Sequence, residues 1–288
     1  MNKEKNPTLK VFPLLRISIN TLFSNGPIVF PYLVILFVQF LLLEILYFFP
    51  QWPLNQFFDP LVSKLESPMF MHYPLNLALL QKMYFQAYIP VYIFFSSFFV
   101  CVAIAAIKDI NEDQKPNVRQ IMVRMLPFYL YIIVTAVLIY AFSYLFSESF
   151  GMIESRADQI RSTAGPFFWL KQTILQGGPY FRLLLNVVAV TLFAYVFPLI
   201  AIERRNLFVA LLENIKYVIT APIKTFMIVL LPTVVFAVVL LARKHVPFEG
   251  EFPEMRAIMI AFSILVMVII DAVVYTSLTM FYLVRKGQ

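Results

Sequence analysis

Hydrophobic residues occur along this chain in six long blocks separated by more polar segments. The blocks lie at 27–49, 84–107, 125–146, 180–202, 224–241 and 257–283. Each has roughly 18–27 residues, and about 20 apolar residues suffice for a helix to cross the hydrocarbon core of a bilayer. Lipid cannot satisfy backbone polar groups, and the blocks lack the alternating polarity of a membrane barrel. The sequence therefore predicts a single all-α transmembrane domain over 1–288, a bundle of about six transmembrane helices.

Three amphipathic segments precede blocks one, three and five, and each leads into a proline. The segments lie at 8–25, 117–125 and 206–220, before Pro27, Pro127 and Pro222. In the third segment the apolar positions cluster on one face of a 3.6-residue period, while Glu213, Asn214 and Lys216 face away. The alternative to an interfacial helix is a polar loop that contains some helix. This alternative does not explain why an amphipathic segment recurs before three spans. We expect three cytoplasmic-surface helices, each opening a repeated unit of amphipathic helix, span, loop and span.

Composition and charge place this bundle in a membrane and orient it. The chain is 61% hydrophobic and 14% charged, whereas a soluble domain has roughly a quarter charged residues. Of its 23 Lys and Arg residues, 14 lie in the N-terminus, 108–124, 203–224 and the C-terminus, and nine lie on the other side. The positive-inside rule makes the first side cytoplasmic. We expect a protein of the bacterial inner membrane with both termini in the cytoplasm, whose net charge of +7 attracts anionic lipid rather than nucleic acid.

The residues typical of catalysis do not form any recognisable set. The two histidines, His72 and His245, lie in predicted loops without metal-ligand spacing, and the single cysteine, Cys101, lies in an apolar block. The sequence contains no Walker A lysine, no dinucleotide-binding glycine motif and no nucleophile-elbow serine. We expect a non-enzymatic protein with no catalytic residues, no metal site and no cofactor.

Two carboxylates, Glu44 and Asp271, lie inside predicted spans. Such residues usually face protein or water, because placing them in lipid costs about 2.5–3.5 kcal/mol on insertion scales. Glu44 is only about 7–8 Å from the end of its span, at the depth of Arg182 and Asn186 in the fourth span. We expect Glu44 to pair with Arg182 or to form a hydrogen bond with Asn186.

Asp271 is deeper, about 21 Å into the last span. Ser96, Ser97 and Thr135 have similar predicted depths, so we expect Asp271 either to bond with such a hydroxyl or to be protonated. Its role has two interpretations: it lines a proton or ion path, or it forms a structural hydrogen bond that locks helix packing. A relay needs several polar residues in line, and the last span supplies few of them.

Two stretches carry a resemblance to a known group of proteins. In the first stretch, one span ends, a short charged turn follows, and an amphipathic helix leads into the next span. Its sequence is FPLIAIERRNLFVALLENIKYVITAPIKTFMIVLLPTVV. AIAAIKDINEDQKPNVRQIMVRMLPFYLYIIV is its earlier counterpart. This layout resembles bacterial six-span YciC-like proteins and the membrane domain attached to some glycerophosphodiester phosphodiesterases. The resemblance implies a six-span topology, and the absence of a phosphodiesterase domain from these residues gives no reason to expect that activity.

Three functions are compatible with these observations. The leading hypothesis is a subunit or scaffold of a larger membrane assembly, in envelope or lipid homeostasis, with membrane lipids and membrane proteins as partners. One alternative is a transporter permease that works with a separate ATPase. Another is a lipid-binding or lipid-moving protein.

Overall fold

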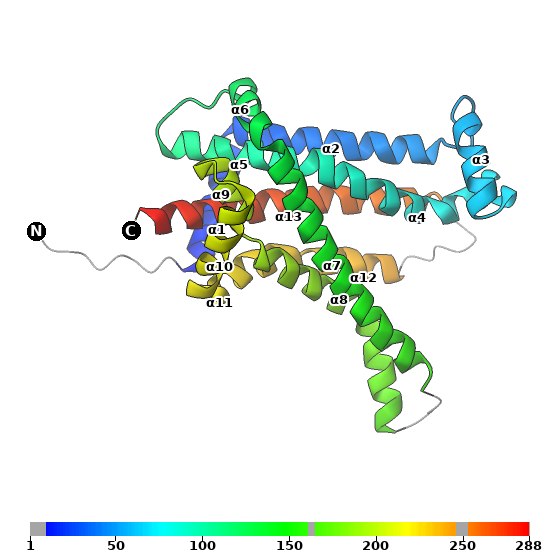
Figure 1. Ribbon diagram of the computed structural model, residues 1–288. Helices are drawn as coiled ribbons and strands as arrows, with labels where there is room; N and C mark the ends of the chain where they lie inside the picture. The colour runs from blue at the N-terminus through cyan, green and yellow to red at the C-terminus, as the bar shows by residue number, and fades with distance from the viewer. Residues whose placement is uncertain (1–9, 161–164, 246–252, 288) are drawn as a thin grey trace, which may run out of the picture.

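The structure is a computed structural model that describes residues 10–160, 165–245 and 253–287, and over these residues it is a helical bundle (Figure 1). Six segments within the described residues are long and apolar enough to cross a membrane. They are Gly26–Tyr47, Leu75–Asn111, Val118–Asp158, Pro166–Glu203, Pro222–Arg243 and Met255–Lys286. The predicted all-α membrane bundle is confirmed, and the chain is a multi-pass membrane protein.

The first part of the chain forms a surface helix and two spans. Its elements are α1 (Val11–Ser24), α2 (Gly26–Tyr47), α3 (Asn55–Leu65), η1 (Pro68–Met71), α4 (Leu75–Pro90), the π-helical turn η2 (Val91–Ser96) and α5 (Ser97–Asn111). Pro27 stands at the start of α2, where its missing N–H has no intrahelical partner to lose. Pro90 lies inside the second span and lacks the N–H that a regular helix requires, and the backbone widens into the π turn directly after it.

The rest of the chain repeats the order of surface helix, span and span twice. The elements are α6 (Val118–Met125), η3 (Leu126–Phe128), α7 (Tyr129–Asp158), α8 (Pro166–Leu192), α9 (Val196–Glu203), α10 (Leu207–Thr220), α11 (Pro222–Val234), α12 (Phe236–His245) and α13 (Met255–Lys286). α7 and α8 extend well beyond their apolar blocks and pack against each other. Their far ends form a hairpin that projects sideways from the bundle (Figure 1).

The bundle has two different ends. One end, which we call the basic end, contains α1, α6, α10 and the last turns of α13 (Figure 1). The opposite end contains α3. The short helices at the basic end turn one face into the bundle and an apolar face outward. α10, for example, buries Ala210 and Asn214 but exposes Phe208 and Leu212. An outward apolar face in this position is suited to contact with the membrane surface.

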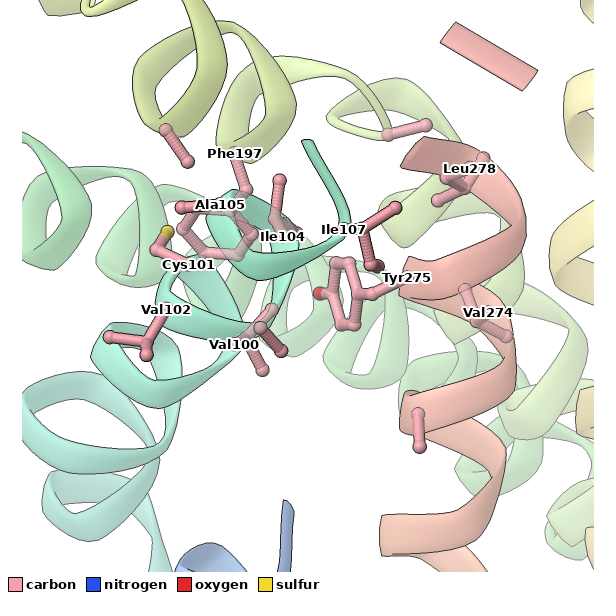
Figure 2. Packing of buried hydrophobic residues seen from close by; sticks show 14 of the residues in the cluster. Val100, Cys101, Val102, Ile104, Ala105, Ile107, Phe197, Val274, Tyr275 and Leu278 are labelled. Carbon is pink, nitrogen blue, oxygen red and sulfur yellow. The ribbon is translucent and has the colours of Figure 1, made fainter. Parts of the chain in front are cut away.

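The longest runs of buried residues lie toward the basic end, where α5, α9 and α13 meet. Every residue of α5 from Phe98 to Ile107 is buried, and so is every residue of α9 from Val196 to Ile202. Figure 2 shows Tyr275 reaching from α13 toward α5, and its ring lies 5.8 Å from that of Phe197. Alanines in α5, such as Ala103, allow the neighbouring helices to approach closely.

The fourth span is interrupted between Leu192 and Val196, and Asn214 of α10 repairs the break. Its Oδ1 accepts a hydrogen bond from the Tyr195 N–H at 2.9 Å, and its Nδ2 donates to the Leu192 carbonyl at 2.7 Å. Lipid offers no partners for backbone groups, so a broken span needs them from a neighbouring element. The prediction that Asn214 faces away with the polar residues is therefore wrong, because this side chain holds α10 against the span.

Candidate functional site

A cavity of about 600 Å³ lies in the half of the bundle nearer α3, with walls from α2, α4, α8, α12 and α13. α4 packs against α2 and α13, α8 packs against α7 and α11, and α13 also packs against α11 and α12. The cavity therefore lies beside α13, between α4 and α8. We call it the lateral cavity. Apart from two tyrosines, its polar lining residues are Gln39, Gln81, Lys82, Asn186, Arg243 and Ser263. The remaining lining is apolar, including Leu183, Ile264 and Met267.

Arg243, near the end of α12, supplies the main charge of the lateral cavity. Its Nη2 donates to Ser263 Oγ at 2.7 Å, and Ser263 in turn donates to the Met259 carbonyl at 2.5 Å. None of the described residues that line the cavity is acidic. The other lining cation, Lys82, forms an ion pair with Glu66. A guanidinium has five N–H donors in a planar fork, so Arg243 retains donors suited to a carboxylate or a phosphate.

Three tyrosines, at four-residue spacing, run inward from the lateral cavity along α4 and η2. Tyr84 and Tyr88 line the cavity, and Tyr92 follows one turn later. The ring centroids of Tyr84 and Tyr88 are 6.2 Å apart, and those of Tyr88 and Tyr92 are 6.0 Å apart. From Tyr84 to Tyr92 the helix rises about 12 Å. We call this row the tyrosine ladder, and it leads from the cavity to the middle of the bundle.

Asp271, near the middle of α13, lies at the inner end of the tyrosine ladder. Its carboxylate is within electrostatic range of the hydroxyls of Tyr32, Tyr88, Tyr92 and Tyr275. These phenols come from α2, α4, η2 and α13. The predicted polar residue in the last span thus has phenol groups of the first, second and last spans in its neighbourhood.

The serine and threonine hydroxyls expected near Asp271 have other environments. Ser97 donates to the Ile93 carbonyl at 2.7 Å, and Thr135 donates to the Tyr131 carbonyl at 2.8 Å. The Ser96 hydroxyl is buried and has no partner among the described residues. The predicted hydrogen bond from a serine or threonine to Asp271 is not present in the described part of the chain, because hydroxyls inside helices bond readily to the carbonyl four residues earlier.

The predicted pairing of Glu44 is also wrong. Glu44 is exposed three residues before α2 ends at Tyr47, whereas Arg182 forms an ion pair with Glu154 of α7. Asn186 accepts a hydrogen bond from Ser143 Oγ at 2.9 Å. The physical reason is helix order: α2 packs against α4, α5 and α13, while α8 packs against α7 and α11. Depth along the membrane alone could not reveal which spans are neighbours.

Sequence reasoning missed Arg243 and the tyrosine ladder. Arg243 lies just beyond the apolar block that ends at residue 241, but α12 continues to His245 and makes Arg243 part of the cavity wall. The ladder did have a sequence signal, because tyrosines spaced by four residues share one helix face. That signal lies in the second span, whereas the relay expected from the sequence was confined to the last span.

The chemistry of the site follows from these groups. Among the described residues, no cluster of three or more His, Cys, Asp or Glu is placed to hold a metal ion. Arg243 can bind an anionic group, the apolar lining can hold a hydrocarbon chain, and hydroxyls that both donate and accept can pass protons.

Three comparisons with known proteins were made for the whole chain. No protein-family model matches it, and no curated protein or solved structure matches it significantly. Its similarity to YciC-like proteins and to the membrane domain of some phosphodiesterases stays a prediction from the sequence layout.

Proposed function

We propose that this protein binds an anionic amphiphile of the membrane in the lateral cavity and functions in lipid binding or lipid movement. The observation that carries the proposal is the position of Arg243, in a largely apolar cavity whose described lining contains no acidic residue. Arg243 is the last residue of the span Pro222–Arg243, and its guanidinium donates to Ser263 of α13 at the cavity wall. Charged residues that face a cavity between spans usually mark a ligand or ion pathway.

The size and lining of the lateral cavity support an amphiphile over a small polar solute. The polar residues Gln39, Gln81 and Asn186 could hold headgroup oxygens beside Arg243, and the apolar lining residues could hold an acyl chain. Ligand pockets typically have about 300–1,000 Å³ and a few placed polar groups within an apolar lining. With the basic end in the cytoplasm, as the positive-inside rule predicts, the lateral cavity is in the half of the bundle toward the outer leaflet.

The test compares spin-labelled phosphatidylglycerol with spin-labelled phosphatidylcholine on the full chain reconstituted in phosphatidylcholine vesicles. We expect a larger protein-bound fraction of the anionic lipid, measured by electron paramagnetic resonance. Arg243→Gln should remove this preference, because a hydrogen bond to a charged group contributes about 1.5–3 kcal/mol, which corresponds to a loss of about tenfold or more in affinity.

Arg156→Gln is the matched control, since Arg156 is an exposed arginine of α7 outside the lateral cavity. This variant should keep the preference for phosphatidylglycerol. If Arg243→Gln and Arg156→Gln have equal effects, the preference arises from general surface charge, and the cavity is not the binding site.

A scaffold role is the second candidate, and the α7–α8 hairpin supports it. This hairpin projects from the bundle (Figure 1) and exposes large apolar side chains, among them Met152, Phe167 and Trp169. Co-purification in mild detergent tests this role: a stable partner lost on Trp169→Ser would support it, and a chain that purifies alone would contradict it.

A permease role predicts ATP-dependent flux only when a separate ATPase is co-expressed.

A further inference from the structure

We propose that Asp271 is a proton-binding site that exchanges protons with water in the lateral cavity along the tyrosine ladder. This proposal goes beyond lipid binding, and it does not depend on which amphiphile, if any, occupies the cavity. It rests on where Asp271 faces, on which groups lie near it and on the buried hydroxyls nearby that form no hydrogen bond of good geometry with protein groups.

Asp271 faces the interior of the bundle and not lipid. The exposed stripe of α13 contains Ile258, Phe262, Leu265 and Ile269, whose exposed fractions are between 37% and 57%. Asp271 follows Ile269 by two residues, which turns it about 200° around the helix. On its own face, Ile264 and Met267 line the lateral cavity, so Asp271 lies one helical turn beyond the inner end of that cavity.

The groups around Asp271 can carry protons but do not neutralise its charge. The titratable groups within electrostatic range of it are Tyr32 of α2, Tyr88 of α4, Tyr92 of η2 and Tyr275 of α13. Cys101 of α5 lies close to Tyr32 and Tyr92. Among the described residues, no Lys or Arg forms an ion pair with Asp271. Without a cationic partner, proton uptake is the direct way for this carboxylate to become neutral in the bundle interior.

Three buried hydroxyls along this route lack a well-formed hydrogen bond to protein groups. The buried hydroxyls are those of Tyr84 at the lateral cavity, Tyr32 near Asp271 and Thr276 in α13, and none forms a hydrogen bond of good geometry with the described residues. The hydroxyls of Tyr32 and Thr276 lie near each other. A buried hydroxyl without a protein partner commonly bonds to an internal water. Water between Tyr84, Tyr88 and Tyr92 would complete a chain of groups that each donate and accept a hydrogen bond.

The step is a reversible proton transfer without a change in oxidation state. A proton leaves hydronium or a buffer acid in the lateral cavity, passes along hydrogen bonds of the tyrosine ladder and internal water, and forms an O–H bond on Asp271 Oδ. Each phenol that gives up its own proton receives another from its neighbour, so the ladder is unchanged after each transfer. Release follows the same path in the opposite direction.

Infrared difference spectroscopy on the full chain in phosphatidylcholine nanodiscs tests this proposal. We expect a protonated-carboxyl band that is lost as the pH rises. The band should be absent from Asp271→Asn and should return, at a shifted frequency, in Asp271→Glu. Glu44→Gln should leave it unchanged. A band that persists in Asp271→Asn, or a titration in wild type that depends on whether the buffer cation is Na⁺ or choline, would overturn the assignment to a proton on Asp271.

The route is tested separately by the rate at which this band shifts after transfer into D₂O. Tyr88→Phe should slow the exchange by about fivefold, the ratio that corresponds to one ordinary hydrogen bond. Tyr144→Phe is the matched control, because Tyr140 and Tyr144 form a similar stacked pair in α7 with centroids 6.3 Å apart and do not line the lateral cavity. Equal rates in the two variants would exclude the ladder as the route.

The proton site and the lipid site can fail independently in these measurements. Arg243→Gln removes the proposed lipid contact, and the carboxyl band should still titrate in this variant. A titrating band without a preference for anionic lipid would contradict the proposed function and leave the proton site standing, and the converse result would contradict the proton site alone.

Discussion

The two halves of α13 have opposite surroundings. From Ala272 to Thr279 every residue is buried against neighbouring helices, and the Ser277 and Thr279 hydroxyls donate to carbonyls of their own helix. From Met255 to Asp271 the same helix has a lipid-exposed stripe on one side and the lateral cavity on the other. Both halves are strongly apolar, so hydrophobicity does not distinguish them. The difference is how closely other helices approach.

This comparison separates a half that maintains the fold from a half that has room for a ligand. At the basic end, polar groups such as Asn214 and Asp109 are matched by partners from neighbouring elements. Toward α3, Arg243 and Tyr84 face a cavity. Substitutions at the basic end should therefore mainly reduce stability, and those in the lateral cavity should mainly change binding.

The largest effect is expected for Asn214→Ala at the basic end. The substitution leaves the Tyr195 N–H and the Leu192 carbonyl without partners. Each orphaned buried group costs about 1–3 kcal/mol, so the loss of stability should be about 2–5 kcal/mol. Thermal unfolding in detergent measures this, with Asn20→Ala on the exposed face of α1 as the control. Similar unfolding temperatures for the two variants would show that the broken span does not depend on this amide.

A smaller loss is expected for Arg124→Ala, also at the basic end. Arg124 Nη2 and Asp109 Oδ2 are 2.5 Å apart, and the Asp109 side chain is 6% exposed. Removing one partner of a buried ion pair costs about 3–5 kcal/mol of stability. The Arg124 side chain is 39% exposed, so solvent screens this pair, and we expect a smaller loss of stability of about 1–3 kcal/mol. Adding Asp109→Asn should recover part of the unfolding temperature. No recovery in the double variant would mean that the lost charge pair is not the cause.

The α7–α8 hairpin should respond less than the basic end. In Gly178→Ala the new Cβ would overlap Oε1 of Glu154, a residue whose Oε2 forms the ion pair with Arg182. Glu154 can move, so the cost should be near the lower limit for overpacking, about 1 kcal/mol. Gly151→Ala on the facing helix meets only Arg182 Nη2, at 3.9 Å, and should be neutral or slightly stabilising. If calorimetry gives the reverse order, the hairpin does not pack as described.

The smallest effect is expected for Tyr73→Phe, outside the spans at the α3 end. The Tyr73 hydroxyl donates to Glu254 Oε1 at 2.6 Å, and this bond lowers the pKa of Glu254 and raises the pKa of Tyr73. The stabilisation is therefore present at neutral pH. It is lost as the pH falls through the lowered Glu254 pKa, and as it rises through the raised Tyr73 pKa.

The measurement is the unfolding temperature of wild type and Tyr73→Phe as a function of pH. The two proteins should differ slightly near neutral pH and converge below about pH 4 and above about pH 10. Tyr144→Phe, at an exposed position of α7, should follow wild type throughout. A constant difference across the pH range would show that the hydroxyl acts through something other than this bond.

Much of the architecture could be predicted because it depends on local pattern. Spans follow from the length of apolar blocks, and α6 and α10 begin after Asn117 and Asn206, whose side chains cap the first turn. The candidate site was less predictable. Asp271 could be identified from its place in an apolar span, but its partners could not, because Tyr32, Tyr88 and Tyr92 come from two other spans.

The sequence by itself determined that this chain is a multi-pass helical membrane protein with a basic end, since hydrophobic length and helical periodicity are properties of neighbouring residues. Only the tertiary structure decided that Asn214 turns inward, that Glu44 and Arg182 stay apart, and that Asp271 lies one helical turn beyond the cavity that Arg243 lines. Those relations depend on which helix faces meet, and side-chain packing between distant segments sets them.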